Sequence, residues 1–374
     1  DTIGVHAPDA APILRAATGQ PREAETETGE AGTAVFRRFE SRPRASRPTV
    51  ALGEVEVSRY AALLLFATFA DLGLAPGAHR IATLADELGI LPRYHRLLTA
   101  CVDILREHGL IRVTGELLTV PGPPPGTTWM RADLVARYPH TQPYVRLLDV
   151  CLTAYPRVLR GDLAATEVLF PGGDLDLVGA IYHGNPGYDA ANTLLAELVS
   201  AAAVEHTGPV LRVLEVGAGT GGTTHAVLAA LEESGVEFEY HYTDISPGLV
   251  AHGRRVFGDH PQLRFAVFDL TADPLAQGVA EHGMDLVVCA NVLHAVAAIA
   301  PTLGNLRRVL APGGLLACLE TTTDREALAL TFGLLDGWHA YTDPHLRLPN
   351  SPLLSEDGWR AALSGAGFAD VRAY

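Results

Sequence analysis

A histidine stands at the end of an apolar run in the carboxyl-terminal half of the chain. The run DLVVCANVLHA is typical of a buried strand that delivers His294 to its carboxyl end. A histidine in such a position is usually a packing residue whose ring has a hydrogen-bond partner. Because a neutral imidazole near pH 7 can also take up a proton, His294 is a candidate general base as well.

A glycine-rich loop indicates a second kind of chemistry, the binding of a nucleotide-like cofactor. The segment LEVGAGTGGTT follows a strand pattern and opens a helix, and its Gly217, Gly219 and Gly222 match the spacing G-x-G-x-x-G. The match is weak by itself, since any tight strand-to-helix turn favours glycine. Asp244 ends the next strand, where its carboxylate can accept hydrogen bonds from ribose hydroxyls. These residues would serve NAD or S-adenosylmethionine.

Three further side chains favour S-adenosylmethionine. Glu215 lies two residues before the first glycine, where a carboxylate can hold the loop and face an ammonium group, whereas an anionic pyrophosphate would be repelled. Asp269 ends the third strand and suits an adenine amino group, and Asn291 ends the fourth, beneath the methionine part of the ligand. The alternative is that the acids only cap helices and form turns.

The elements that position these side chains follow from residue 208 onward. Near-continuous apolar strands separated by amphipathic helices predict an α/β fold whose parallel sheet is covered on both faces. Ligands of such sheets bind beyond the carboxyl ends of the strands, where His294 is expected. The expected strands are VLRVLEV, EFEYHYTD, LRFAVFD, DLVVCAN and GLLACLE, with helices at about 223–234, 246–257, 273–282 and 299–310.

The rest of the chain is expected to form two further segments. Residues 1–48 are polar and turn-rich, which predicts a flexible linker. Residues 49–203 are mostly helical and predict a separate subdomain, within which 57–120 resembles a winged-helix arrangement that packs against a partner or substrate. Residues 204–374 then form the cofactor-binding core.

Composition excludes some partners. The 28 basic and 43 acidic residues give a net charge of −15, which disfavours nucleic acid. The longest apolar run, YAALLLFATFA, is shorter than a membrane span. The four cysteines form no CxxC pair, so we expect reduced, buried thiols in a cytoplasmic protein. A start at Asp1 and an end at Tyr374, inside a strand pattern, suggest a piece of a longer polypeptide.

Several segments together resemble the class I S-adenosylmethionine methyltransferases, and more closely the carbon methyltransferase domains of polyketide synthases. The resemblance covers about 140–374 well and 57–120 loosely. It implies a Rossmann-like parallel sheet with a helical amino-terminal lid or subdomain, and a last strand pair before which the chain stops. The segments are LEVGAGTGGTT, YTDIS, FDLTADPLAQG, ANVLHA, LAPGGLL, LETT, VLRGDLAATEVLFPGG, IYHGNPGYDAANTLL and FGLLDGWHAYTDPHLRLPNSPLLSEDGW.

The resemblance also implies a catalytic pair, His294 and Glu320, and no metal. Adjacent parallel strands lie about 5 Å apart, so both side chains can meet over the sheet. Glu320 would fix the tautomer of His294 and stabilise its imidazolium, and Glu320→Gln is expected to cost less activity than His294→Ala. The implied cofactor-binding residues are Glu215, Gly217, Gly219, Asp244, Ile245, Asp269, Leu270 and Asn291.

Strand ends are open to water unless they are covered. We therefore expect the helical region and the segment 322–354 to form a lid, with Tyr182 and Trp338 lining a tunnel for a phosphopantetheine-borne chain. The alternative is that both rings only pack the core. At position 339, where the family often has a second tryptophan, this chain has His339, which puts the shape of the lid in question.

The activity that the resemblance implies is methylation of the α-carbon of a β-ketoacyl thioester on an acyl carrier protein, beside other synthase domains. The α-proton is acidic because the enolate delocalises onto two carbonyls, and His294 would remove it. Two alternatives stay open. An O-methyltransferase of natural products would suit the winged-helix-like segment, and an inactive pseudo-methyltransferase would be a structural spacer.

Overall fold

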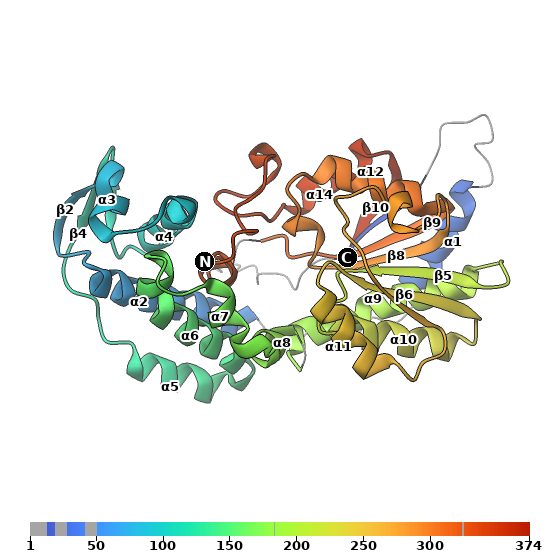
Figure 1. Ribbon diagram of the computed structural model, residues 1–374, viewed down its shortest axis with the longest axis horizontal. Coiled ribbons are helices and arrows are strands. Elements are labelled where there is room, and N and C mark those ends of the chain that lie inside the picture. The colour runs from blue at the N-terminus through green and yellow to red at the C-terminus, as the bar shows by residue number, and fades with distance from the viewer. Residues whose placement is uncertain (1–12, 19–27, 42–50, 183, 324) are drawn as a thin grey trace, which may run out of the picture.

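The computed structural model consists of a helical region and a region built on one large sheet, which lie side by side in Figure 1. The helices of residues 51–182, from blue to green, make up most of the first region, and the yellow to red elements, together with the blue helix α1, make up most of the second. The structure describes residues 13–18, 28–41, 51–182, 184–323 and 325–374.

Five parallel strands form the centre of the sheet, as the sequence predicts. Their order in space is β9-β8-β5-β6-β7. The chain adds β6 and β7 on one side of β5 and then crosses back to add β8 and β9 on the other side. This order creates a switch point beside β5, where ligands of open α/β sheets bind. The strands are β5 (Leu211–Val216), β6 (Phe238–Asp244), β7 (Leu263–Val267), β8 (Met284–Ala290) and β9 (Leu310–Leu319).

Helices cover both faces of this sheet. One face packs against α1 (Thr28–Glu40), α9 (Pro186–Glu205) and α10 (Gly222–Ser234). The other packs against α12 (Ile299–Val309) and α14 (Glu356–Gly365), and α11 (Pro247–Phe257) follows β6.

The segment 273–282, expected as a helix, contains only a short 3₁₀ turn, η4 (Leu275–Gln277). Gly278 ends it in the left-handed conformation. The expectation of a longer helix at this place is therefore wrong.

The amino-terminal segment corrects the prediction of a flexible linker over 1–48. Residues Ile13–Thr18 form β1, which lies between β9 and β10 (Phe368–Ala373) and pairs antiparallel with both. In α1, Phe36 and Phe39 are buried against the sheet. The last strand pair is thus present, against expectation. The polar residues on either side of β1 and α1 made these elements hard to recognise in the sequence. Residues 1–12, 19–27 and 42–50 lie outside the described part of the chain.

The helical region has its own core and a small antiparallel sheet of order β2-β4-β3. The helix α13 follows β9 in the chain but packs among these helices, so the helical region contains residues from both sides of the predicted boundary. The domain boundaries at 49–203 and 204–374 therefore stay a prediction. The region contains α2 (Ala51–Leu72), β2 (Gly77–Arg80), α3 (Ile81–Leu88), α4 (His95–Glu107), β3 (Arg112–Thr114), β4 (Leu117–Val120), α5 (Thr128–Arg137), α6 (Gln142–Leu159), α7 (Ala165–Leu169), α8 (Asp176–Tyr182) and α13 (Glu326–Phe332).

Two expectations about the whole chain can be compared with the structure. All four cysteines are free and buried, as expected. Among the described helices, none has the length and apolar character needed to cross a bilayer.

Candidate active site

The glycine loop connects β5 to α10 in a conformation that requires glycine. Gly217 and Gly219 have φ values of 67° and 59°, in the left-handed region. A Cβ atom on Gly217 would also lie 2.4 Å from Cγ2 of Val292. The N–H of Gly219 donates to Oδ2 of Asp244 at 3.0 Å, so the carboxylate at the end of β6 holds the loop.

Glu215 lies beneath this loop and is 2% exposed. Its Oε2 accepts hydrogen bonds from the hydroxyls of Thr224 (2.7 Å) and Tyr240 (2.8 Å), which join β5 to α10 and β6. Burial raises the pKa of Glu215 to about 7, although both hydrogen bonds oppose the rise. The expected function of holding the loop fits this geometry. Glu215 is not among the residues that line the adjoining cavity, and its expected contact with an ammonium group stays a prediction.

A cavity of about 640 Å³, here called the loop cavity, lies over the glycine loop. Gly217, Gly219 and Asn291 line it, together with Tyr182 of α8 and Tyr188 near the start of α9. The sequence-predicted cofactor residues of β5 and β8 are therefore brought together.

The remaining predicted cofactor residues follow β6 and β7, which are neighbours in the sheet. Burial raises the pKa of Asp244, and hydrogen bonds from the N–H groups of Ser246 and Gly219 oppose the rise. Ile245 is 65% exposed beside this carboxylate, and Leu270 is buried. Asp269 accepts from the N–H (2.8 Å) and hydroxyl (2.7 Å) of Thr271 through Oδ1. These residues border the site without lining the loop cavity.

The predicted catalytic pair is in direct contact. Nδ1 of His294 lies 2.6 Å from Oε2 of Glu320, which has no exposed surface. The other carboxylate oxygen, Oε1, accepts from the N–H groups of Val292 (3.0 Å) and Leu293 (2.7 Å). Glu320 follows β9 and His294 follows the neighbouring β8, as the strand order requires. Because Oε1 is held by two backbone groups, the carboxylate is fixed where it orients the imidazole.

A second cavity, of about 730 Å³, contains His294 and is here called the histidine cavity. It shares Tyr182, Tyr188 and Asn291 with the loop cavity, so the two spaces adjoin. Trp338 lines it from the segment after α13, with its ring 6.2 Å from the His294 ring and nearly perpendicular to it. Tyr182 and Trp338 thus lie at the same cavity as His294, where the sequence analysis places them.

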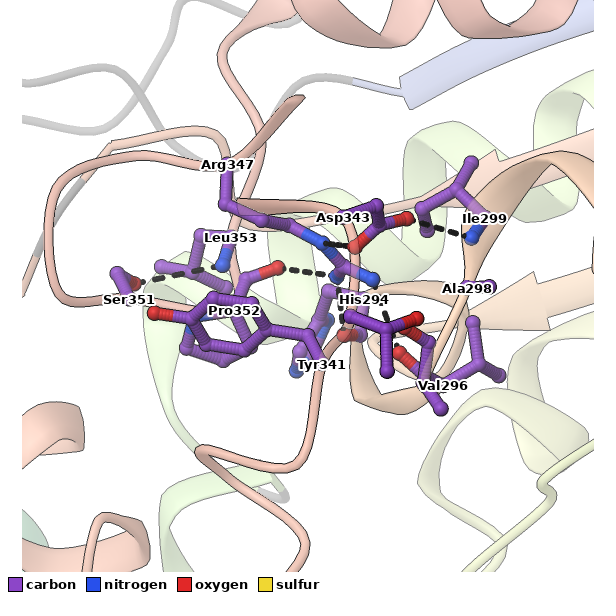
Figure 2. A network of polar contacts seen from close by, with 12 residues as sticks. His294, Val296, Ala298, Ile299, Tyr341, Asp343, Arg347, Ser351, Pro352 and Leu353 are labelled. Carbon is purple, nitrogen blue, oxygen red and sulfur yellow. Dashed lines mark hydrogen bonds and ion pairs between the residues drawn. The ribbon is translucent and has the colours of Figure 1, made fainter. Parts of the chain in front are cut away.

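A buried arginine, Arg347, connects the segment after α13 to the loop of residues 294–296 by hydrogen bonds (Figure 2). Its Nη1 donates to the carbonyls of His294 (2.7 Å) and Pro352 (2.6 Å), and its Nη2 donates to that of Val296 (2.9 Å). Its Nε donates to Asp343 (2.7 Å). Sequence reasoning missed Arg347. The signal was a charged residue among the apolar residues and prolines of HLRLPNSPLL.

Asp343 completes the connection. Its Oδ2 accepts from the N–H of Ile299 (2.8 Å), the first residue of α12. Burial would raise the pKa of Asp343, but the hydrogen bonds from Arg347 and Ile299 outweigh it, and the pKa lies below its usual value. Both charges of this buried pair therefore have partners.

The segment after α13 is also attached to the helical region. Arg96 of α4 donates to the carbonyls of His339 and Tyr341 (3.3 Å for Tyr341). The ring nitrogens of His339 are buried without a hydrogen-bond partner, and burial lowers the pKa of His339 to about 4. The side chain at this position is therefore a neutral packing group, in place of the tryptophan often found in the family.

Comparison with known proteins finds similarity along nearly the whole chain. A family model described as a methyltransferase domain matches residues 214–316. Polyketide synthase ThaG of Burkholderia thailandensis is 38% identical over 82% of this chain, which spans 6% of that synthase. The DszA carbon methyltransferase structure has a TM-score of 0.81 at 35% identity, covering 96% of this chain and 93% of that one. The CurJ carbon methyltransferase gives 0.80 at 28% identity, covering 91% and 90%.

Proposed function

This chain belongs to the S-adenosylmethionine-dependent carbon methyltransferases of polyketide synthases, and on that premise we propose that it methylates the α-carbon of a β-ketoacyl thioester carried by an acyl carrier protein. The observation that supports this most is the contact of His294 with a fully buried Glu320 at a cavity that adjoins the glycine loop. A general base is thereby available beside the cavity over the glycine loop.

The residues present fit S-adenosylmethionine. The loop of Gly217 and Gly219 brings backbone close to the ligand space, where a side chain on Gly217 would collide with Val292. Asp244 offers carboxylate oxygens for ribose hydroxyls, and the exposed Ile245 offers an apolar surface for the adenine ring, with Asp269 and Leu270 further along the same edge. When bound, S-adenosylmethionine supplies the methyl group that the substrate carbon accepts.

His294 is proposed to act through Nε2, because Nδ1 is engaged by Glu320. The carboxylate holds the proton on Nδ1, which leaves the lone pair of Nε2 free to take the α-proton of the substrate. The imidazolium that forms is stabilised by the negative charge of Glu320, and the enolate is left to accept the methyl group. Positioning in adjoining cavities contributes to the rate by proximity.

The carrier protein and the neighbouring synthase domains are proposed partners. Residues of the segment 325–354 and of the helical region line the histidine cavity, which supports a tunnel for a phosphopantetheine-borne chain. Tyr182 and Trp338 are proposed to contact the substrate there.

The test is mass spectrometry of a synthetic β-ketoacyl thioester after incubation with S-adenosylmethionine. We expect a product with one added methyl group on the α-carbon. Calorimetry should detect binding of S-adenosylmethionine or S-adenosylhomocysteine and none of NAD. Gly219→Val should abolish that binding, because valine disfavours a φ of 59° and fills the ligand space.

Other results would contradict the proposal. A methyl group on oxygen would assign the chain to the O-methyltransferases. Binding of the cofactor without any transfer, to free or carrier-bound thioesters, would favour an inactive spacer domain.

A further inference from the structure

A third cavity, here called the side cavity, lies beside the histidine cavity. Its volume is about 710 Å³, and its walls come from α2, from the start of α6, from Asn185 before α9 and from α13. Leu328 of α13 lines both the side cavity and the histidine cavity, so the two spaces adjoin at this side chain. At the outer end, Val55 is 56% exposed.

The lining of the side cavity is mostly apolar, with charges that already have partners. Val55, Val57, Ala327 and Leu328 contribute aliphatic surface. The charged residues of the wall neutralise each other, because Nη1 of Arg325 donates to Glu54 at 2.8 Å. A ligand in this cavity therefore meets hydrocarbon and very few free polar groups.

Two polar atoms in the wall make no hydrogen bond of normal geometry. Asn185 is 3% exposed, and its Oδ1 caps α9 by accepting from the N–H of Gly187 at 3.1 Å. Its Nδ2 makes no hydrogen bond of normal geometry, although the side chain of Tyr144 in the same wall interacts with the Asn185 amide. Nε2 of His140, in the same wall, is also buried without one. Buried donors without acceptors are costly, so an oxygen of a ligand is the partner that Asn185 lacks.

We propose that the side cavity binds the acyl chain of the substrate beyond its β-carbon, and that Nδ2 of Asn185 donates a hydrogen bond to a hydroxyl or ketone oxygen on that chain. This rests on the proposed function and adds a determinant of specificity to it. The pantetheine arm is the other half of the substrate, and it carries amides, a hydroxyl and a phosphate. The apolar surface of the wall offers few groups for the amides of the arm, and Arg325 is already bonded to Glu54 and is not free to bind the phosphate.

The first arm of the test varies chain length. Thioesters of N-acetylcysteamine are prepared with a short β-ketobutyryl group and with longer saturated β-ketoacyl groups. For the wild type, kcat/KM should rise by roughly threefold to fourfold per buried methylene. Ala327→Phe should remove most of this rise, because a phenyl group fills the cavity. Should Ala327→Phe fail to fold, Val55→Trp closes the outer end from an exposed position, with Val204→Trp, an exposed valine of α9, as its matched control.

The second arm varies the oxygen. Two long thioesters of equal length are compared, one saturated and one with a hydroxyl beyond the β-carbon. Asn185→Asp keeps the helix cap and removes the donor, and Asn185→Ser keeps the cap with a shorter side chain. We expect the preference of the wild type for the oxygenated chain to fall by roughly 3–10-fold in both variants. Calorimetric binding of S-adenosylhomocysteine confirms that each variant is folded.

The outcomes separate this inference from the proposed function. If the wild type methylates neither the short nor the long thioester, nor a carrier-bound one, the proposed function fails. If it methylates them but the dependence on length persists in the Ala327→Phe or Val55→Trp protein, the inference is overturned. It is also overturned if the variants instead reduce the advantage of a full pantetheine thioester over the truncated one, because the cavity would then hold the arm.

Discussion

His294 and Glu320 are held in one protonation arrangement by the atoms around them. Oε1 of Glu320 is occupied by two backbone N–H groups, and Oε2 faces Nδ1 of His294. The tautomer with its proton on Nδ1 is the one that gives the carboxylate a donor. Nε2 is then the basic atom. The basicity of Nε2 therefore depends on a carboxylate at Glu320, because both oxygens of a carboxylate accept hydrogen bonds, whereas an amide has only one accepting oxygen.

The first prediction compares His294→Ala with Glu320→Gln. His294→Ala should lower turnover by roughly 10²–10⁴-fold and leave binding of S-adenosylhomocysteine nearly intact. The sequence analysis expected a smaller loss for Glu320→Gln. With Oε1 kept by the backbone donors, the glutamine amide would donate to Nδ1 and force the proton onto Nε2. We therefore expect a comparable loss. Turnover measured by mass spectrometry, with deuterium exchange at the α-carbon, tests this. Exchange at the wild-type rate in His294→Ala would make His294 a packing residue.

The second prediction concerns Glu215 and pH. Its pKa is raised from 4.5 to about 7 by burial, so its contribution to stability is present below about pH 4.5 and is lost as the pH rises through 7. Glu215→Gln keeps an oxygen for Thr224 and Tyr240 and cannot ionise. The free energy of unfolding of the variant relative to the wild type should therefore increase from pH 5 to pH 7 and then stay constant. Urea titrations across this range measure it, and a difference independent of pH would contradict it.

Residue types at strand ends were the most informative part of the sequence. Asp244, Asn291, His294 and Glu320 were placed from the pattern of apolar strands alone or with the family resemblance, and they lie where parallel strands end. Asn185 and Arg347 were not foreseen. Their importance depends on which distant segments they contact, and the charge of Arg347 among apolar residues and prolines does not indicate which segments it joins.

At the scale of elements, the segment between α13 and α14 is the part of the active site with least secondary structure. It holds its position through Arg347 and Asp343 on one side and Arg96 on the other. The buried guanidinium supplies hydrogen bonds that a regular element would supply through its own backbone. Because Nη1 of Arg347 donates to the carbonyl of His294, the segment and the proposed catalytic histidine are positioned together.

The third prediction is that Arg347→Met weakens both stability and turnover. It leaves Asp343 and three carbonyls without their donor, which should cost about 3–5 kcal/mol of folding free energy. Turnover should fall while the affinity for S-adenosylhomocysteine changes little, and Arg347→Lys should restore part of both.

Arg137→Met is the matched control, because Arg137 and Asp133 form an ion pair with the same four-residue spacing on an exposed surface. We expect Arg137→Met to lower the free energy of unfolding by at most about 1 kcal/mol. Equal effects of the two substitutions in chemical denaturation would contradict a positioning function for Arg347.

The elements that the sequence predicted well are those with strong periodicity. The five central strands are apolar and long enough to be recognised, and the structure has all of them. The strand β1 is short and lies between polar stretches, so its pattern resembles that of a linker. It becomes a strand only because β9 and β10 offer hydrogen-bonding edges, which is a property of the assembled sheet.

At the scale of the whole molecule, the site belongs to neither region alone. The chain leaves the sheet after β9, contributes α13 to the helical core, and returns to the sheet as α14 and β10. The adjoining loop and histidine cavities therefore have walls from both regions. Sequence analysis can assign each region a fold, but the cavity between them depends on how side chains from distant segments pack.

The last prediction tests whether the amino-terminal segment is part of this fold. In a chain that begins at residue 28, β9 and β10 would lose the strand between them and expose unpaired backbone groups. We expect Tm to fall by about 5–10 °C and aggregation to increase. A synthetic peptide of residues 10–20 should raise Tm again by pairing with the open edges, and a peptide with scrambled order should not. If the shortened chain melts like the full one, β1 contributes nothing to the sheet, and the interpretation of 1–48 as a linker would be restored.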